Sequence, residues 1–255
     1  MSRYISPVLY ILLMLVGCMA FVSIAGVRVG VFEPLTRFSM LRDSVLASLV
    51  LSLFAVLSLG ICRKERNIAS QRFFVLVLIV SLLYSVMWIA FYLQRSGLPD
   101  INDVTTDMET PPTFLNINFI RKTNENDLNY NREWAAIQKK YYPNVQPVFS
   151  SKDKAAVYAL VERLVEERDW DVVAKYSDAG MIEATARTPI LGFRDDIVIR
   201  LTEIDGDQRI RVDMRSCSRV GQGDYGVNAE RIESFMGDLS ESLSRPAVPH
   251  INFSR

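Results

Sequence analysis

Three long stretches without a charged residue limit most strongly how this chain can fold. They lie in the first third of the sequence, at residues 7–27, 44–62 and 73–93. An α-helix rises about 1.5 Å per residue, so about 20 apolar residues cross the roughly 30 Å hydrocarbon core of a bilayer with every backbone group bonded inside the helix. The sequence therefore predicts a membrane module with three transmembrane helices at residues 1–95.

Two other interpretations of these stretches compete with membrane-spanning helices. Three buried helices of a water-soluble core would have to follow one another without a polar face, which is unusual for such helices. Leu15 to Cys18 looks like a bacterial lipoprotein cleavage site, but the chain stays apolar through Val27, whereas mature lipoproteins turn polar after the cysteine. Membrane-spanning helices, with the lipid bilayer as partner, remain the expectation.

Basic residues flank the spans unevenly, and such residues are retained on the cytoplasmic side. Arg3, Arg63, Lys64, Arg66 and Arg72 lie on one side of the membrane, and Arg28, Arg37, Arg42 and Arg95 lie on the other. This distribution favours a cytoplasmic N-terminus. The predicted location is a bacterial inner membrane, with the C-terminal domain on the periplasmic side.

The remaining chain divides by composition. Residues 96–143 are rich in Asp, Asn and Pro, which predicts a linker and irregular extension with one short helix at 132–142. Residues 144–243 have the pattern of a soluble domain, and 244–255 form a tail. Two amphipathic helices are expected in the domain, at 152–168 with Ser151 as N-cap and at 227–243 with Asp224 as N-cap.

Four strands are expected between these helices, at residues 170–176, 181–188, 195–203 and 209–218. Turn signals at 178–180 and 205–207 predict antiparallel hairpins. The predicted fold class is therefore α+β: three N-terminal transmembrane helices, followed by a soluble domain of helix, four-stranded antiparallel meander and helix.

Alternation along the strands separates an apolar face from a charged face. The apolar residues are Ile182, Ala184, Ala186, Ile197, Ile199, Leu201, Ile210, Val212 and Met214. We expect both helices to cover them. The opposite face carries Glu183, Thr185, Arg187, Asp196, Arg200, Arg209, Arg211, Asp213 and Arg215. We expect that face to be solvated and to carry cross-strand ion pairs.

Several short segments occur together in order. They are Thr105–Asp107 with Pro111–Pro112, Tyr142–Pro143, Gly192–Asp196, Arg215–Gly221 and Asn228–Ile232. Together they resemble the bacterial family catalogued as domain of unknown function 1499, over about residues 105–239. The membrane module resembles that of the members with an N-terminal hydrophobic region. The resemblance supports the predicted fold and implies no activity, substrate or cofactor.

Residues 221–226 spell GxGxxG ahead of the last helix. A dinucleotide-binding fingerprint needs a parallel βαβ unit and an acidic residue at the end of the next strand, whereas no strand follows here. We interpret the pattern as accidental. The amides at this helix N-terminus, flanked by Arg215 and Arg219, are a candidate anion site, against a plain helix cap by Asp224.

A polar group gathers on two neighbouring strands and the turn after them. Its members, the candidate ligand-binding residues, are Asp195, Asp196, Arg200, Asp213, Arg215, Ser216, Ser218, Arg219, Asp224 and Asn228. Three interpretations stay open: a structural network of ion pairs and caps, a binding site for an anionic group, and carboxylates that perform acid–base chemistry. The neighbouring arginines favour the first, because opposite charges keep carboxylates ionised.

Other site types lack the residues they need. Basic and acidic residues are equal in number, 29 each, so the sequence predicts no basic face for nucleic acid. Cys18, Cys62 and Cys217 have no metal or disulfide spacing, and the only histidine, His250, lies in the tail. We expect no cofactor, no metal site and no catalytic residue.

The leading hypothesis is a membrane-anchored envelope protein, whose soluble domain binds a partner protein or an anionic small ligand without turnover. One alternative is a hydrolase that acts on an anionic envelope substrate with Asp195 and Asp196. The other alternative is a structural spacer.

Overall fold

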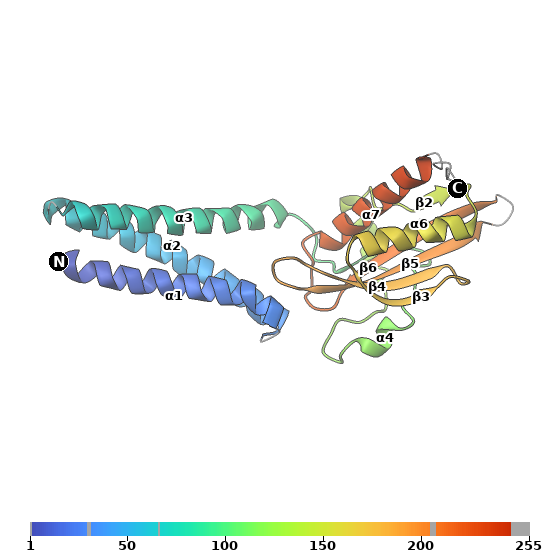
Figure 1. Cartoon of the computed structure of the whole chain (residues 1–255), viewed down its shortest axis with the longest axis horizontal. Coiled ribbons are helices and arrows are strands. Elements are labelled where there is room, and N and C mark those ends of the chain that lie inside the picture. Colours follow the sequence, from blue (N-terminus) through green and yellow to red (C-terminus); the bar gives the residue numbers. More distant parts are fainter. Residues whose placement is uncertain (1, 30–31, 66, 205–207, 246–255) are drawn as a thin grey trace, which may run out of the picture. The chain divides into compact units, whose positions relative to one another are not determined.

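The computed structural model describes residues 2–29, 32–65, 67–204 and 208–245. The chain forms two compact units, one of helices that ends at Gly97 and one of mixed α and β structure that begins at Leu98 (Figure 1). Arg66 of the basic loop, the turn expected at 205–207 and the tail with His250 lie outside the described residues.

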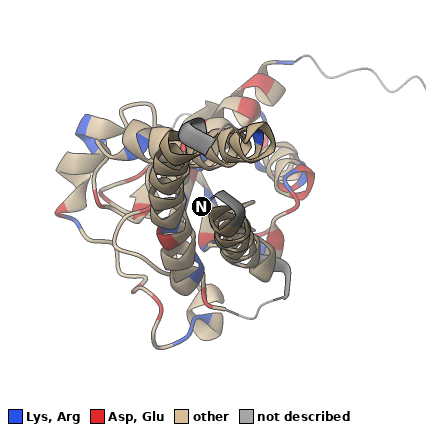
Figure 2. Cartoon of the chain, turned by 90° about the vertical axis from the view of Figure 1, so that its left-hand side faces the viewer, with Lys and Arg blue, Asp and Glu red and all other residues tan. Residues whose placement is uncertain are grey.

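The first unit consists of α1 (Ser2–Val29), α2 (Pro34–Glu65) and α3 (Ile68–Arg95). Each helix contains one of the three predicted spans and is long and apolar enough to cross a membrane. Viewed end-on, the helices show few charged residues along their length (Figure 2). The prediction of three membrane-spanning helices is confirmed in length and composition, which indicates a membrane protein.

Serine side chains join α2 to α3. The hydroxyls of Ser44 and Tyr84 lie 2.6 Å apart, and Ser48 donates to the carbonyl of Ser81 at 2.9 Å. Because serine is small, it lets the two helix backbones approach closely, and its hydroxyl finds a partner that lipid cannot supply. An apolar cluster joins all three helices: Leu9, Leu51, Ala55, Cys62, Phe74 and Val77.

The second unit is built on a six-stranded antiparallel sheet. Its strands are β1 (Asp103–Thr105), β2 (Val148–Ser150), β3 (Asp171–Tyr176), β4 (Met181–Arg187), β5 (Arg194–Ile204) and β6 (Arg209–Ser218). The order is β1-β6-β5-β4-β3, and β2 also pairs with β6. The four predicted strands form the predicted meander. Two strands of three residues each were not predicted, because they are too short to show an alternating pattern.

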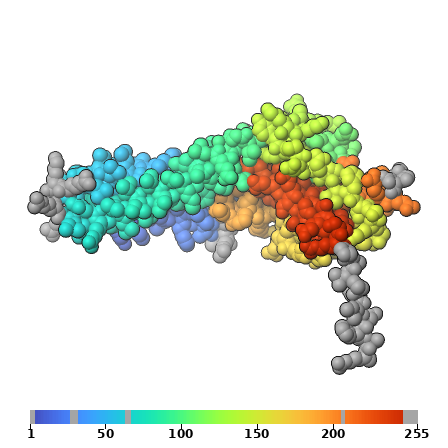
Figure 3. All heavy atoms as spheres, turned by 90° about the horizontal axis from the view of Figure 1, so that it is seen from above, coloured from blue at the N-terminus to red at the C-terminus, as the bar shows by residue number. Residues whose placement is uncertain are grey.

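Two helices, α6 (Lys154–Glu167) and α7 (Val227–Ser244), cover one face of the sheet (Figure 1), and Figure 3 shows α7 lying across this side. All nine apolar residues predicted for this face are buried in one core, as expected. The N-cap of α6 is Asp153, which accepts from the amide of Ala156 at 2.8 Å, so the prediction of Ser151 was wrong.

Much of the charged face of the sheet is also covered. The prediction that this face is solvated was wrong for five of its nine residues, which are buried, whereas Arg187 and Arg209 are exposed. Residues 106–133, here called the cover segment, run over it and include the single turn α4 (Ile117–Ile120), which lies on the side of the sheet opposite α6 and α7 (Figure 1). Glu183 and Asp196 beneath it are 0% exposed, and Arg215 is 2% exposed. A local charge pattern cannot show that a distant segment folds over it.

The segment expected to be a linker is therefore largely part of the second unit. Residues 101–107 are all buried, and β1 pairs with β6 in the register Asp103↔Cys217. The short helix expected at 132–142 is α5 (Trp134–Tyr141). Only Ser96 and Gly97 separate α3 from this unit.

Candidate functional site

Glu183 of β4 holds the start of α4. Its carboxylate accepts from the backbone amides of Leu115, Asn116 and Ile117, at 2.6 to 3.2 Å. These amides have no partner within the helix turn, and a carboxylate is the group best suited to satisfy them. The charge on Glu183 is thus used to fix one part of the cover segment on the sheet.

Arg215 of β6 holds the two ends of the cover segment together. Its guanidinium forms a bidentate ion pair with Asp103, at 2.9 and 2.6 Å, and donates to the carbonyls of Pro112 at 3.1 Å and Leu128 at 2.6 Å. It also lies 5.1 Å from the ring centre of Phe114. Burial raises the pKa of Asp103 above its usual value, and the bond to Arg215 opposes this shift.

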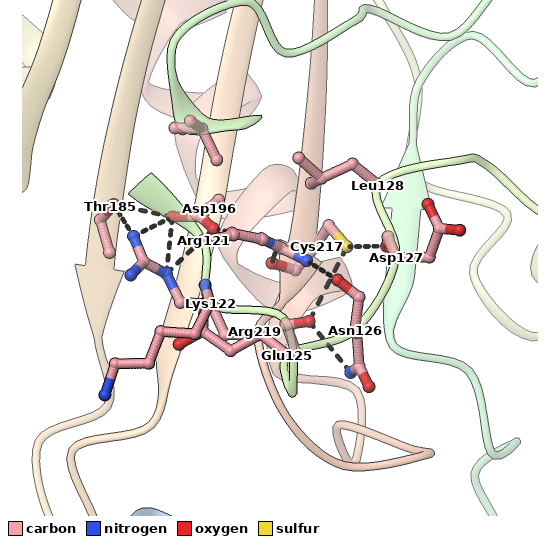
Figure 4. A network of polar contacts seen from close by, with 12 residues as sticks. Arg121, Lys122, Glu125, Asn126, Asp127, Leu128, Thr185, Asp196, Cys217 and Arg219 are labelled. Carbon is pink, nitrogen blue, oxygen red and sulfur yellow. Dashed lines mark hydrogen bonds and ion pairs between the residues drawn. The ribbon is translucent and has the colours of Figure 1, made fainter. Parts of the chain in front are cut away.

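Asp196 of β5 lies between two guanidinium groups (Figure 4). It accepts from Arg121 of the cover segment at 2.7 Å, from Arg219 at 2.8 to 3.1 Å, and from the Thr185 hydroxyl at 2.7 Å. Arg121 also donates to the carbonyl of Cys217 at 2.9 Å. Every polar group in this cluster has a partner inside the protein, as buried charges require.

A third cluster holds the start of the cover segment. Asp213 accepts from the Thr106 hydroxyl at 2.8 Å, and Arg200 bridges Asp213 and Asp107 at 3.3 and 3.0 Å. Burial acts to raise the pKa of Asp107, but hydrogen bonds from Thr110 and the charge of a neighbouring arginine bring it below its usual value. Asp107 is therefore ionised, as an ion pair requires.

The helix-covered face carries a separate polar network. Asp195 pairs with Arg231 of α7 at 2.6 Å, and Arg231 donates to Ser216 at 2.9 Å and to Asn228 at 2.6 Å. The side-chain amide of Asn228 donates in turn to the Ser218 hydroxyl at 2.9 Å. This network ties β5 and β6 to the first turn of α7.

Asp224 caps this turn from two positions before it. The N-cap position itself is Gly226, with φ of 81°, so the N-cap prediction was wrong, but the Asp224 carboxylate accepts from the amides of Gly226 at 2.9 Å and Asn228 at 2.7 Å. Burial raises the pKa of Asp224 to about 6, and these two hydrogen bonds oppose the shift. The amides considered as an anion site thus have an internal partner, and Arg215 and Arg219 lie on the other face.

The ten candidate site residues therefore do not form one site. Asp196, Arg200, Asp213, Arg215 and Arg219 lie under the cover segment, whereas Asp195, Ser216, Ser218, Asp224 and Asn228 lie on the helix-covered face. Adjacent residues of a strand point to opposite faces of its sheet, and this separates Asp195 from Asp196.

Two glycines of residues 221–226 have local structural reasons that do not involve a nucleotide. A Cβ on Gly223 would lie 2.9 Å from a carboxylate oxygen of Asp100 and 3.0 Å from its Cα. Gly226 adopts a left-handed conformation that favours glycine, and a Cβ there would lie 2.8 Å from Leu98. The glycines let the connection from β6 to α7 cross the start of the domain.

The comparison with known protein families matches residues 103–239 to the family described as Protein of unknown function (DUF1499). The chain belongs to this family. The matched region begins at β1 and ends within α7. The DUF1499 domain therefore includes the cover segment, the polar network beneath it and the separate polar network on the helix-covered face. No match was found among curated proteins.

Asp195, Asp196 and Cys217 are the residues considered for chemistry in the DUF1499 domain. Asp195 and Asp196 face opposite sides of the sheet, and each is paired with arginine. Burial raises the pKa of the Cys217 thiol to about 12, which disfavours the reactive thiolate. Among the residues that the structure describes, no group of His, Cys, Asp and Glu side chains has the arrangement of a metal site.

The outer side of the cover segment carries exposed apolar side chains instead. Phe119 is 85% exposed, and Leu115 and Ile120 are each 47% exposed; we call these three residues the α4 patch. A hollow of about 300 Å³ opens next to α4, lined by Asn118, Arg121, Lys122, Thr123, Glu125, Asn126, Asp127 and Leu128.

Sequence reasoning missed the α4 patch. The only signal was five large apolar residues between Phe114 and Ile120, interrupted by Asn116 and Asn118, inside an otherwise polar, Asn-rich stretch. Phe114 and Ile117 of these five are buried against Val198 and Cys217 of the sheet. Which of the five face outward is decided by the contacts of α4 with Glu183 and the sheet.

Proposed function

We propose that this protein is a membrane-anchored docking protein of the bacterial cell envelope, whose DUF1499 domain binds a partner protein through the α4 patch, without turnover. One observation carries the proposal: large apolar side chains are exposed on a segment that buried ion pairs hold in place. A rigid apolar group loses little conformational entropy on binding, and such groups supply most of the energy of an interface.

The surroundings of the patch fit a protein partner. Interfaces have an apolar centre and a polar rim, and the exposed residues Lys122, Thr123 and Asn124 follow the patch along the chain. The same contacts argue against an anionic small ligand, because Arg121, Arg215 and Arg219 already bind protein carboxylates. A hydrolase gains no support from Asp195 and Asp196, which lie on opposite faces.

The proposed location is the inner membrane, with the DUF1499 domain on the periplasmic side. The excess of Arg and Lys at the N-terminus and between the second and third spans supports it. A reporter enzyme that is active only outside the cytoplasm, fused after Arg255, is expected to be active. An inactive reporter, together with an active cytoplasmic one, would reverse the orientation.

Photo-crosslinking in native membranes tests the docking surface. A photoreactive amino acid in place of Phe119 is expected to form an adduct with a different protein, and the Ile120→Ser substitution is expected to abolish that adduct. The matched control is the same amino acid in place of Phe149 of β2, an aromatic residue that is 48% exposed and lies outside the patch.

Three results would contradict the proposal. The same adducts at positions 119 and 149 would show unspecific capture. An adduct of twice the mass of this chain, or with lipid alone, would assign the patch to a second copy or to the bilayer. No adduct at position 119 would leave the domain as a spacer.

A further inference from the structure

Helix α5 lies against the sheet at β1, and one residue fixes its inner face. Gln138 is 1% exposed. Its side-chain carbonyl accepts from the amide of Thr105 at 3.0 Å, and its NH₂ group donates to the carbonyl of Thr105 at 2.7 Å. Because β1 ends the strand order, Gln138 takes the place of a strand partner at this position. The contact decides which face of α5 points outward.

The outward face of α5 is both apolar and basic. Ile137 is 36% exposed and Tyr141 is 42% exposed, and the two lie one helical turn apart. Lys139 and Lys140 are also exposed, and the Lys140 ammonium group lies 5.0 Å from the centre of the Tyr141 ring. Tyrosine is enriched at membrane interfaces, and lysine attracts anionic headgroups.

The two lysines of α5 carry charge that the protein does not neutralise. Within the described part of the chain, neither ammonium group forms an ion pair with a carboxylate, whereas the buried arginines of the domain are paired. Residues 134–152 contain no Asp or Glu, and Glu133 lies at the opposite end of α5. This face therefore favours an anionic partner from outside the chain.

The C-terminal end of α5 lies beside the residue with which the domain begins. Tyr142, the C-cap of α5, and Leu98, which packs on the domain core, both lie against Gly226. A Cβ on Gly226 would lie 3.5 Å from the Tyr142 hydroxyl and 2.8 Å from Leu98.

The connection to the third apolar span is short. Arg95 ends α3, and the three peptide steps from Arg95 to Leu98 extend over about 11 Å at most. This length is close to the Debye length at physiological ionic strength, about 8 Å, over which headgroups attract lysine. The length of the chain alone thus brings the end of α5 within reach of headgroups.

We propose that the outward face of α5 is a second membrane contact of this protein and binds anionic lipid headgroups. Lys139 and Lys140 contact the phosphates, and Tyr141 enters the headgroup layer beside them. An acidic protein would also attract the lysines, but the exposed tyrosine and the short connection to α3 favour lipid. The face shares no residue with the α4 patch, so the proposal stands or falls separately from the proposed function.

Photo-crosslinking of the full chain in nanodiscs tests this contact. The nanodiscs contain phosphatidylcholine with a minor share of phosphatidylglycerol, and a photoreactive amino acid replaces Tyr141. Mass spectrometry of the intact chain is expected to detect phosphatidylglycerol adducts above the share of this lipid in the bilayer. Lys139→Gln combined with Lys140→Gln is expected to lower these adducts about tenfold. Raising the salt concentration is expected to lower them without any substitution, because salt screens the attraction.

Two controls are matched to these changes. Lys122→Gln combined with Lys152→Gln alters the net charge equally outside α5 and is expected to leave the adducts unchanged. The photoreactive amino acid in place of Phe149, which is 48% exposed, is expected to give no lipid adduct. Phe149 belongs to β2, which pairs with the other end of β6 from β1.

Four results would overturn the proposal. Equal lipid adducts at positions 141 and 149 would show unspecific contact, and no lipid adduct at position 141 would show that α5 does not meet the bilayer. Adducts that the lysine substitutions and salt leave unchanged would show that headgroup charge is not recognised. A protein adduct at position 141 in native membranes, in place of lipid, would assign the face to a protein partner. Circular dichroism checks that each variant keeps its helix content.

Discussion

At the scale of single residues, buried charges in the DUF1499 domain hold the cover segment on the sheet. Glu183, Asp196 and Arg215 each contact at least two groups of the cover segment or of the sheet beneath it. A buried charge without partners costs several kcal/mol, so each of these residues stabilises the fold only while its partners stay in place. Substitutions that keep the shape and change the charge expose this dependence.

Glu183→Gln is the most direct of these substitutions. The neutral side chain presents one NH₂ group to backbone amides that need an acceptor, so we expect the free energy of unfolding to fall by about 2 to 4 kcal/mol. Thermal unfolding of the full chain in detergent measures it. The matched control is Glu203→Gln, whose side chain is 69% exposed, and it is expected to change stability by less than about 0.5 kcal/mol. Equal effects of the two would contradict the capping role.

The raised pKa of Asp224 predicts that the stability of the domain depends on pH. Its pKa is about 6 in the folded protein and 3.8 in an ordinary peptide, so the folded state binds more protons between these values. Stability due to this group therefore falls as the pH rises from about 4 to about 6, by on the order of 2 kcal/mol, a figure lowered because the residue is partly exposed.

The comparison with Asp224→Asn isolates this effect from that of other titrating groups. The difference in unfolding free energy between the two proteins is expected to change between pH 4 and pH 6 and to stay constant above about pH 7. Denaturant unfolding of the full chain at several pH values measures it. A difference that does not vary with pH would show that the carboxyl group keeps its ordinary pKa.

At the scale of elements, the cover segment behaves as an extra layer of the domain. It has little regular structure of its own, and its fixed position depends on contacts at both ends and in the middle. Arg215 connects distant parts of it, because its planar guanidinium reaches Pro112 and Leu128 of the cover segment and Asp103 of β1 at once. A lysine cannot reproduce that geometry.

Arg215→Lys is therefore expected to loosen the cover segment. We expect amide hydrogen exchange within residues 112–130 to speed up and stability to fall by about 3 to 5 kcal/mol, the usual cost of breaking a buried pair. Hydrogen exchange with mass spectrometry measures both. Arg209→Lys, at an exposed position near the start of the same strand, serves as the control. Faster exchange spread evenly over the sheet would contradict a role of Arg215 that is limited to the cover segment.

At the scale of the whole molecule, one part of the chain is suited to lipid and the other part to water. The helices up to Arg95 are apolar on most sides, whereas the unit from Leu98 has its own core and two polar networks. Only Ser96 and Gly97 lie between α3 and that unit, so a short connection tethers the DUF1499 domain to the apolar helices.

The full chain is expected to stay with membranes through high-salt and alkaline washes and to need detergent for extraction. Three apolar helices cannot leave the bilayer without exposing their surface to water. Sedimentation followed by immunodetection of the intact chain measures this. A chain that appears in the high-speed supernatant without detergent would contradict the membrane assignment.

The sheet shows what local sequence patterns can and cannot predict. Ile182 and Ile199 were assigned to the core from alternation alone, and both are buried. The same alternation grouped Glu183 and Asp196 correctly on one face but could not show that this face is covered. Asp195 was grouped with Asp196 from sequence proximity, although the pleat of the strand places them on opposite faces.

The sequence by itself determined the membrane spans, the four long strands, the two covering helices and the family, because these depend on hydrophobicity, periodicity and motifs within short stretches. Only the tertiary structure decided the cover segment, the strands β1 and β2, the two separate polar networks and the α4 patch. These depend on contacts between residues far apart in the sequence, such as Arg215 with Asp103, which are 112 positions apart. No local pattern encodes which distant partner a buried charge will find.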